Sequence, residues 1–141
     1  MSSIDATQLH GPKHVEAYLE TDGEVGHEWR NDTSILILTT KGRKSGEERS
    51  TPLIYQPFGD DHLVVASKGG ADEPPAWYVN LEADPEVEVQ VLDNVFRARA
   101  RTATAEEKPQ LWETMLEEWP HYAEYQEKTD REIPVVVLQR R

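Results

Sequence analysis

The chain has 141 residues and a formal net charge of −12, which fits one acidic domain with a single core. Cysteine is absent, so disulfides, cysteine-bound zinc, iron–sulfur clusters and thiol nucleophiles are excluded. Most of such a surface should repel the phosphates of DNA and RNA, so no nucleic acid is expected as a partner.

The sequence shows no sign of membrane insertion or export. No apolar run approaches the ~20 residues that cross a bilayer, and the start of the chain lacks the basic and apolar segments of a signal peptide. We therefore expect a cytoplasmic protein without a transmembrane segment. It should fold as one domain over residues 1–141, with residues 1–11 flexible.

Hydrophobic periodicity in the first half of the chain predicts one helix and three strands. Pro12 suits a first helical position, and Val15, Tyr18 and Leu19 then share one face. The apolar run at residues 34–40 is typical of a strand buried on both faces. The elements are expected at residues 12–21 for the helix and at residues 34–40, 51–57 and 62–67 for the strands.

The second half predicts three helices and three strands. Thr104 is a good cap for the longest helix, and Pro120 can begin the helix that follows it. A tight turn with positive φ is expected at Asp93 and Asn94. The elements are expected at residues 76–84, 104–119 and 120–129 for the helices and at 86–91, 95–103 and 133–139 for the strands.

Apolar and basic residues alternate in the strand at residues 95–103. One face carries Phe96, Ala98 and Ala100, and the other carries Arg97, Arg99 and Arg101. We interpret the arginine row as a solvated outer face rather than a ligand site. With about six strands and short flanking helices, the pattern predicts an α+β fold whose mostly antiparallel sheet curls into a small barrel.

Several common catalytic motifs are missing. Gly42 and Gly46 are separated by three residues and followed by Glu47, so a P-loop is rejected. His27 begins a zincin-like pattern, but Asn31 stands where the second histidine is required. There is no Gly-x-Ser-x-Gly elbow. The sequence therefore predicts no metal site and no hydrolase nucleophile.

A basic segment lies between the first two predicted strands. Four cations (Lys41, Arg43, Lys44 and Arg49) outnumber two anions (Glu47 and Glu48), a local charge of +2 in a chain of −12. Glycines let backbone N–H groups converge, and arginine offers a planar fork for phosphate or carboxylate oxygens. The segment is either a solvated hairpin tip or a cradle for a small anion, and Lys68 at the end of another strand favours the cradle.

Aromatic residues form a second group of candidates. Trp77 and Tyr78 lie on one predicted helix, and Trp119, Tyr122 and Tyr125 are spaced by three near the end of the chain. Steps of three keep side chains on one helical stripe. These side chains either pack in the core or line a pocket, where a tyrosine hydroxyl could donate a proton.

Three ordered segments resemble one known family, the deazaflavin-dependent nitroreductase family of F420-binding oxidoreductases. They are LTTKGRKSGEERSTPLIY (38–55), VVASKGGADEPPAWYVNLEADPEVEVQV (64–91) and WPHYAEYQEKTDREIPVVVL (119–138). The resemblance implies a split β-barrel and the cofactor coenzyme F420, a deazaflavin whose tail carries a phosphodiester and glutamate carboxylates. It also allows a homodimer, because barrels of this kind often pair through a sheet face.

The resemblance also implies which residues contact the cofactor. Tail contacts are expected from Arg43, Lys44, Ser45 and Arg49, and contacts along the cofactor from Ser50, Thr51, Pro52 and Leu53. Contacts with the ring system are expected from Val65, Ala66, Ser67, Lys68, Ala76, Trp77, Tyr78, Val79, Asn80 and Tyr122.

The implied activity is hydride transfer from the reduced deazaflavin to an electron-poor small molecule such as a quinone, an enone or a nitro compound. Ser67, Tyr122 and Tyr125 are the candidate catalytic residues on the acceptor side. Trp119 stands where a nitroimidazole-activating member has tyrosine, so nitro reduction is not implied. An FMN-binding split-barrel flavoprotein and a non-catalytic F420 carrier are the alternatives.

Overall fold

The computed structural model describes residues 11–141, apart from the side chain of Asn31. The expected flexibility of residues 1–11 lies outside the described residues except at Gly11, which begins a helix. The helices are α1 (Gly11–Thr21), α2 (Ala76–Ala83), α3 (Lys108–Glu118) and α4 (His121–Glu127), with short 3₁₀ turns η2 (Arg30–Asp32) and η3 (Lys68–Gly70). The strands are β1 (Ile35–Lys41), β2 (Glu48–Ile54), β3 (Gln56–Phe58), β4 (Asp61–Val65), β5 (Glu86–Val91), β6 (Asn94–Thr102) and β7 (Val135–Arg140).

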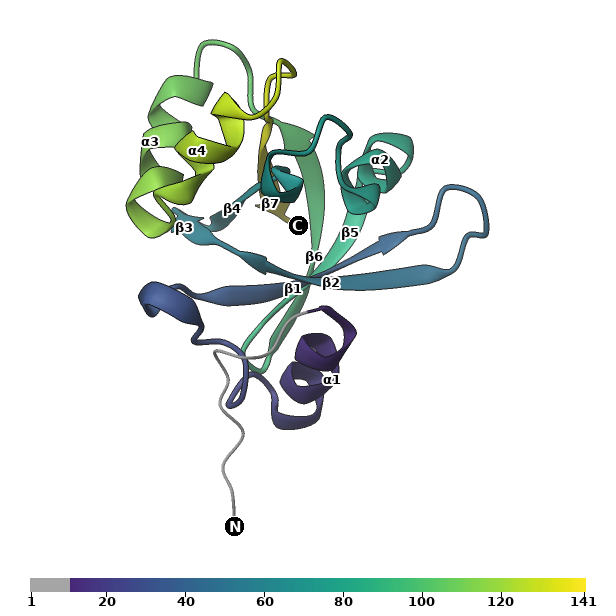
Figure 1. The fold of residues 1–141 in the computed structure, drawn as a ribbon. Helices are drawn as coiled ribbons and strands as arrows, with labels where there is room; N and C mark the ends of the chain where they lie inside the picture. Colours follow the sequence, from purple (N-terminus) through teal and green to yellow (C-terminus); the bar gives the residue numbers. More distant parts are fainter. Residues whose placement is uncertain (1–10) are drawn as a thin grey trace.

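The seven strands described form one antiparallel sheet in the order β2-β1-β5-β6-β7-β4-β3. β2 and β3 lie at opposite ends of this order, although only Tyr55 separates them in the chain. The sheet must therefore curl until its two edges approach each other (Figure 1). The expected α+β split barrel is confirmed.

The strand expected at residues 51–57 is two strands. β2 begins earlier, at Glu48, and the chain changes partner at Tyr55, whose N–H donates to Ser34 O at 3.1 Å. Both prolines of the segment, Pro52 and Pro57, lie on the outermost strands, where a missing N–H breaks no central ladder. This division is why the described sheet has seven strands where about six were expected.

The barrel interior is apolar. Its buried members come from six elements and include Leu36, Leu38, Tyr55, Val64, Val87, Val89, Phe96, Ala98, Ala100, Val136 and Leu138. The predicted alternation in β6 is confirmed, because Phe96, Ala98 and Ala100 point inward while Arg97 and Arg99 are exposed.

The helices cover the outside of the barrel on two sides (Figure 1). α1 covers β1, and Tyr18 packs on Ile35 and Ile37, so β1 is buried on both faces as expected. The buried stripe of α1 is His14 and Tyr18, whereas Leu19 is exposed. Leu19 was expected to share the packed face of the helix with Tyr18, and this prediction was wrong. The residues that face the strand are His14 and Tyr18, which are spaced i, i+4, and Leu19 lies outside their stripe.

α3 and α4 cover β4 and β7 on the other side, with Leu111, Met115 and Tyr122 buried against the sheet. Thr104 precedes α3 and makes a capping box: its N–H donates to Glu107 Oε1 at 2.8 Å, and the Glu107 N–H donates to Thr104 Oγ1 at 3.3 Å. Regular helix begins only at Lys108, with Glu107 in the N-cap position, so Thr104 closes the turn that leads into α3 rather than the helix itself.

The β5–β6 turn differs from the prediction. Val91 pairs with Asn94, so Leu92 and Asp93 form the turn, and positive φ occurs at Leu92 (56°) rather than at Asp93 or Asn94. A hydrogen bond from the Leu92 N–H to Tyr18 Oη at 2.7 Å holds this turn against α1. The tertiary contact therefore overrides the local preference for Asn or Asp.

Two enclosed histidines make the fold sensitive to acid. His27 Nε2 lies 2.9 Å from Tyr55 Oη, and the His62 ring lies between the rings of Tyr55 and Phe96, with centroids 5.5 and 5.3 Å away. The buried His62 Nδ1 has no hydrogen-bond partner among the described residues. Burial lowers the pKa of both histidines below 6.5, and Arg140 lowers that of His62 further.

We predict that the free energy of unfolding falls as the pH is lowered from 6.5, because the unfolded chain binds the two protons before the folded chain does. Each histidine can contribute a slope of up to about 1.4 kcal/mol per pH unit. Urea titrations between about pH 5.5 and 7.5 measure this slope. His62→Phe should reduce this slope, and an unchanged slope in His62→Phe would contradict the assignment.

Candidate cofactor and acceptor site

Two adjoining hollows lie along β2. The first, here called the basic hollow, has a volume of about 400 Å³ and lies between the β1–β2 hairpin and α2. It is lined by Gly42, Arg43, Lys44, Ser45, Arg49, Thr51, Ala76, Trp77 and Asn80. The hairpin that carries its cations extends away from the barrel beside α2 (Figure 1).

The hairpin tip is compact, because it is closed by its own backbone. The Gly42 N–H donates to Glu47 O at 2.7 Å, and the Gly46 N–H donates to Gly42 O at 2.8 Å. Gly46 has a φ of 73°, which L side chains rarely adopt. Glu47 pairs with Arg49 at 3.4 Å, but both side chains are exposed, so this pair contributes little and leaves the basic charge available.

Asn80 fixes the hairpin to α2. Its Oδ1 accepts hydrogen bonds from the Arg43 backbone N–H at 3.2 Å and from Arg43 Nη1 at 3.0 Å. Its Nδ2 donates to Thr40 Oγ1 at 3.3 Å. Because Asn80 is buried, these bonds orient the Arg43 guanidinium in the basic hollow. Asn80 was expected as a cofactor contact, and in the structure it also holds Arg43 in place.

The second hollow, here called the aromatic cleft, has a volume of about 300 Å³. One wall comes from the start of the chain and β2: Gly11, His14, Trp29, Ile35, Pro52, Leu53 and Ile54. The other comes from the loop after β4 and from the region of α4: Val65, Ser67, Lys68, Gly69, Pro75, Trp77, Trp119, Tyr122 and Tyr125. Trp77 lines both hollows, so the two depressions adjoin at this side chain.

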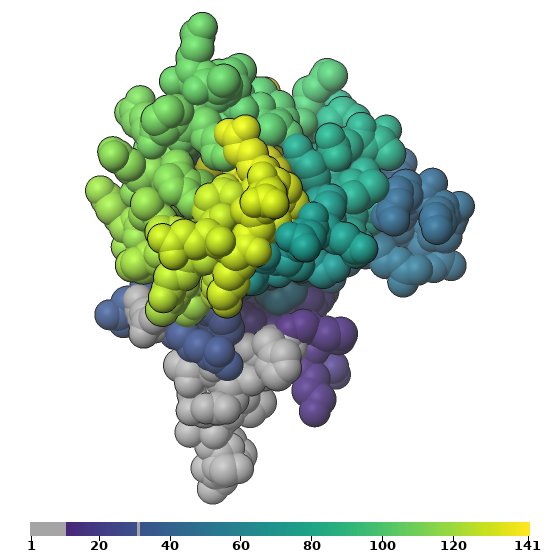
Figure 2. Space-filling model, turned by 45° about the horizontal axis from the view of Figure 1, so that its top comes forward, coloured from purple at the N-terminus to yellow at the C-terminus, as the bar shows by residue number. Residues whose placement is uncertain are grey.

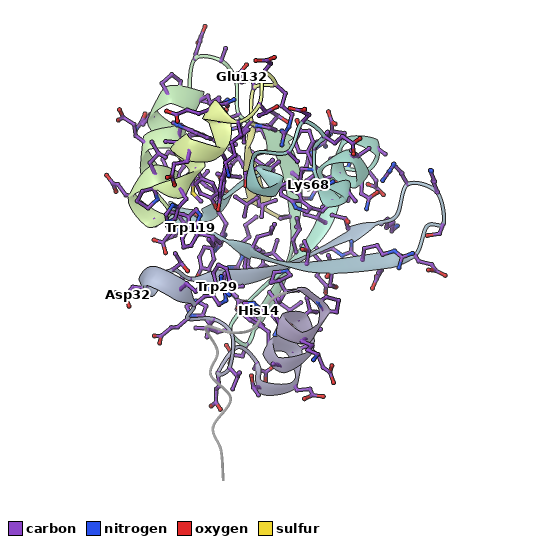
Figure 3. All side chains as sticks on the ribbon, in the orientation of Figure 1. His14, Trp29, Asp32, Lys68, Trp119 and Glu132 are labelled. Carbon is purple, nitrogen blue, oxygen red and sulfur yellow. The ribbon has the colours of Figure 1, made fainter. Side chains whose placement is uncertain are left out.

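The indole rings of Trp29 and Trp119 face each other across part of the cleft, with centroids 5.9 Å apart (Figure 3). Trp119 Nε1–H also donates to Tyr125 Oη at 3.3 Å. A phenol oxygen that accepts a bond keeps its own O–H as a donor. Tyr125 can therefore offer a proton to a molecule in the cleft.

Tyr122 has a different environment from Tyr125. It is buried, and burial raises the pKa of its phenol far above the ordinary range, with smaller contributions from Tyr125 and Glu118. A raised pKa makes the group a weaker acid. Tyr122 is therefore a weaker proton donor than an ordinary tyrosine.

The loop after β4 presents Ser67, Lys68 and Gly69 to the cleft. Lys68 has a φ of 46°, an unfavourable conformation for a residue with a side chain, and Gly69 and Gly70 also have positive φ. The surrounding contacts must hold this loop in place. Lys68 itself is exposed at the rim of the cleft (Figure 3).

Some expected contact residues do not line either hollow. Tyr78 Oη bonds to Thr102 Oγ1 at 2.7 Å and lines a different cavity. The hydroxyl of Ser50 bonds to that of Thr39 at 2.7 Å. Ala66 is fully buried, and Val79 does not line either hollow. A cofactor contact stays a prediction for these four residues and equally for those that line the hollows.

Sequence reasoning also missed residues of the site, among them His14, Trp29 and Arg131. His14 and Trp29 reach the cleft from the α1 side, and the His14 Nε2 lies 2.8 Å from Gly26 O. His14 could have been found from its i, i+4 spacing to Tyr18. Trp29 gave no local signal. Arg131 binds the backbone of the loop after β4, and only the folded chain brings these segments together.

Residues 11–141 contain no group of three His, Asp or Glu side chains arranged to hold a metal ion. None of the helices described is long and apolar enough to cross a bilayer.

Comparison with known proteins identifies the family. The profile of the F420H(2)-dependent quinone reductase family matches residues 12–140. An F420H(2)-dependent quinone reductase of Mycobacterium tuberculosis is 40% identical over 131 residues, which cover 91% of this chain and 88% of that protein.

Solved structures agree with this assignment. The structure of an F420-H2 dependent reductase is 43% identical with a TM-score of 0.70, and the match covers 74% of this chain and 93% of the other. A domain-swapped dimer is 41% identical with a TM-score of 0.73, over 89% of this chain and 93% of the other. The resemblance to F420-binding oxidoreductases is confirmed, with quinone rather than nitro reduction in the family's name. The chain belongs to the F420H(2)-dependent quinone reductase family, whose cofactor is coenzyme F420.

Proposed function

We propose that this protein transfers a hydride from reduced coenzyme F420 to a quinone or a similar electron-poor small molecule. The observation that carries the proposal is that Trp77 belongs to both hollows. A ligand with an anionic tail and a flat ring could place its tail in the basic hollow and its ring in the aromatic cleft. The residues present therefore fit this cofactor.

The basic hollow would hold the tail. Arg43, Lys44 and Arg49 bring three positive charges to a surface that is otherwise acidic. Guanidinium and ammonium groups form charge-assisted hydrogen bonds with phosphate and carboxylate oxygens. Ser45 and Thr51 add hydroxyl groups to the same hollow.

The aromatic cleft would hold the ring and the acceptor. When bound, the reduced cofactor supplies the hydride. The chain's own residues orient the reactants and exclude water, with Pro52, Val65 and Trp77 as apolar walls. A quinone that gains a hydride becomes a hydroquinone anion and needs one proton, which the Tyr125 O–H would donate. Ser67, on the same wall as Tyr125, would contact the acceptor or the ring.

The setting of the reaction remains a prediction. The acceptor would be a small molecule rather than a protein or nucleic acid, and the protein would act in the cytoplasm. A homodimer is supported by the similar structure that is a domain-swapped dimer. Sedimentation of the purified chain would measure its oligomeric state.

We predict that Lys44→Ala and Arg49→Ala each weaken binding of coenzyme F420 by about 1.5–3 kcal/mol, because each removes one charge-assisted contact. Quenching of intrinsic tryptophan fluorescence measures the Kd, since Trp77 lines the site. Lys41→Ala is the matched control, because it removes the same charge from the same hairpin outside the hollow. Equal losses in all three variants would indicate a general charge effect, and no saturable binding by the wild type would refute the proposed function.

We predict that Tyr125→Phe lowers kcat for quinone reduction by about 10²-fold or more, the usual contribution of a general acid. The Kd for coenzyme F420 should change little, because Tyr125 is outside the basic hollow. Tyr122→Phe is the comparison, and we expect a smaller loss because its phenol is a weaker acid. A larger loss in Tyr122→Phe would reverse the assignment. Binding without turnover over a panel of quinones, enones and nitro compounds would instead favour a carrier.

A further inference from the structure

Within residues 11–141, the hydrogen bonds of the Arg131 guanidinium go to backbone carbonyl groups of one short loop. Its Nε donates to Ala71 O at 2.8 Å, and its Nη2 donates to Ser67 O at 2.9 Å. Nη1 and Nη2 both lie 3.3 Å from Ala66 O. No carboxylate of residues 11–141 forms an ion pair with this guanidinium. A half-buried cation is thus used to hold three peptide groups.

Two other contacts join the same loop to the same end of α4. Thr129 Oγ1 donates to Asp72 Oδ1 at 2.8 Å, and Thr129 is buried. Gly70 lies so close to α4 that an added Cβ would be 2.6 Å from Tyr125 O. The space-filling view shows the loop (teal) packed against the α4 region (yellow) (Figure 2).

These contacts join two segments that together form one wall of the aromatic cleft. The loop carries Ser67 and Lys68, and α4 carries Tyr122 and Tyr125. The loop's own backbone would not hold its shape, because Lys68 is at a positive φ. The distance between Ser67 and the tyrosines therefore depends on the groups that tie the loop to the segment after α4.

We propose that Arg131 is a positioning residue for the reaction. By binding the carbonyls of Ala66, Ser67 and Ala71, it sets the spacing between the Ser67 side of the cleft and Tyr125. The claim that this spacing serves hydride transfer rests on the proposed function, but the hydrogen bonds between Arg131 and the loop do not. Arginine suits the task because its rigid fork of five N–H donors reaches several carbonyls at once, whereas lysine has a single nitrogen.

The kinetic test compares Arg131→Lys, Arg131→Gln and Thr129→Val with the control Lys108→Gln. Lys108 is also a partly buried cation of this region, but its ion pair is with Glu132 at 3.0 Å and not with the loop. Displacement of reacting groups by about 1 Å can cost about 10²-fold in rate. We expect kcat to fall about 10–100-fold in both Arg131 variants and less in Thr129→Val. The Kd for coenzyme F420 should stay within about threefold, since the basic hollow is intact.

A purely structural role predicts a different result. The Arg131 variants would then lose thermal stability with kcat per folded molecule unchanged, and that outcome would overturn the proposal. So would a loss of kcat in Lys108→Gln as large as in Arg131→Lys, because Lys108 does not touch the loop.

Hydrogen exchange tests whether Arg131 holds the loop after β4, and this measurement does not require turnover. The Gly70 N–H donates to Ser67 O at 2.9 Å, and the Ala71 N–H donates to Lys68 O at 3.2 Å. In Arg131→Lys these amides should exchange faster, while the amides of β6 and β7 keep their protection. Unchanged protection would overturn the proposal even if the wild type did not oxidise the reduced cofactor. If these amides exchange faster in Arg131→Lys but the wild type shows no turnover, Arg131 still holds the loop and only the proposed function is refuted.

Discussion

The passage of the chain through Tyr55 is the constraint on which the rest of the structure depends. β2 pairs with β1 at one end of the sheet, and β3 pairs with β4 at the other. Since one residue separates β2 from β3, the sheet cannot stay open, and its two edges are brought together. The residues of β2 and the loop after β4 are thereby placed on opposite sides of one cleft, although β2 and β4 are not neighbours in the sheet.

The placement of charge follows from this closure. The β1–β2 hairpin holds its cations beyond the barrel, where Asn80 of α2 binds Arg43 at the hollow's edge. A net positive segment in a chain of −12 attracts anions to one place and repels them elsewhere. The apolar and aromatic surfaces lie at the other end of the depression, past Trp77. An elongated ligand with one charged end would therefore favour a single orientation.

Much of the fold could be predicted from the sequence, because local patterns were strong. The alternation in β5 and β6, the apolar run of β1 and the turn that Thr104 closes before α3 each depend on neighbouring residues alone. Errors occurred where a distant segment decided the outcome. Tyr55 divides a strand because its two halves have different partners, and Leu92 takes the positive φ because Tyr18 binds its N–H.

The candidate site shows the same difference between what local sequence and what distant segments decide. The sequence by itself determined that Arg43, Lys44 and Arg49 lie within one hairpin, which predicts anion binding, and the family resemblance supplied a ligand with a matching tail. Only the tertiary structure decided which aromatic side chains meet, since Trp29 and Trp119 are far apart in the chain. It also decided that Tyr78 turns away and that Arg131 holds the loop after β4. Strand pairing and packing decide which side chains meet across a closed barrel, and local sequence patterns do not predict these contacts.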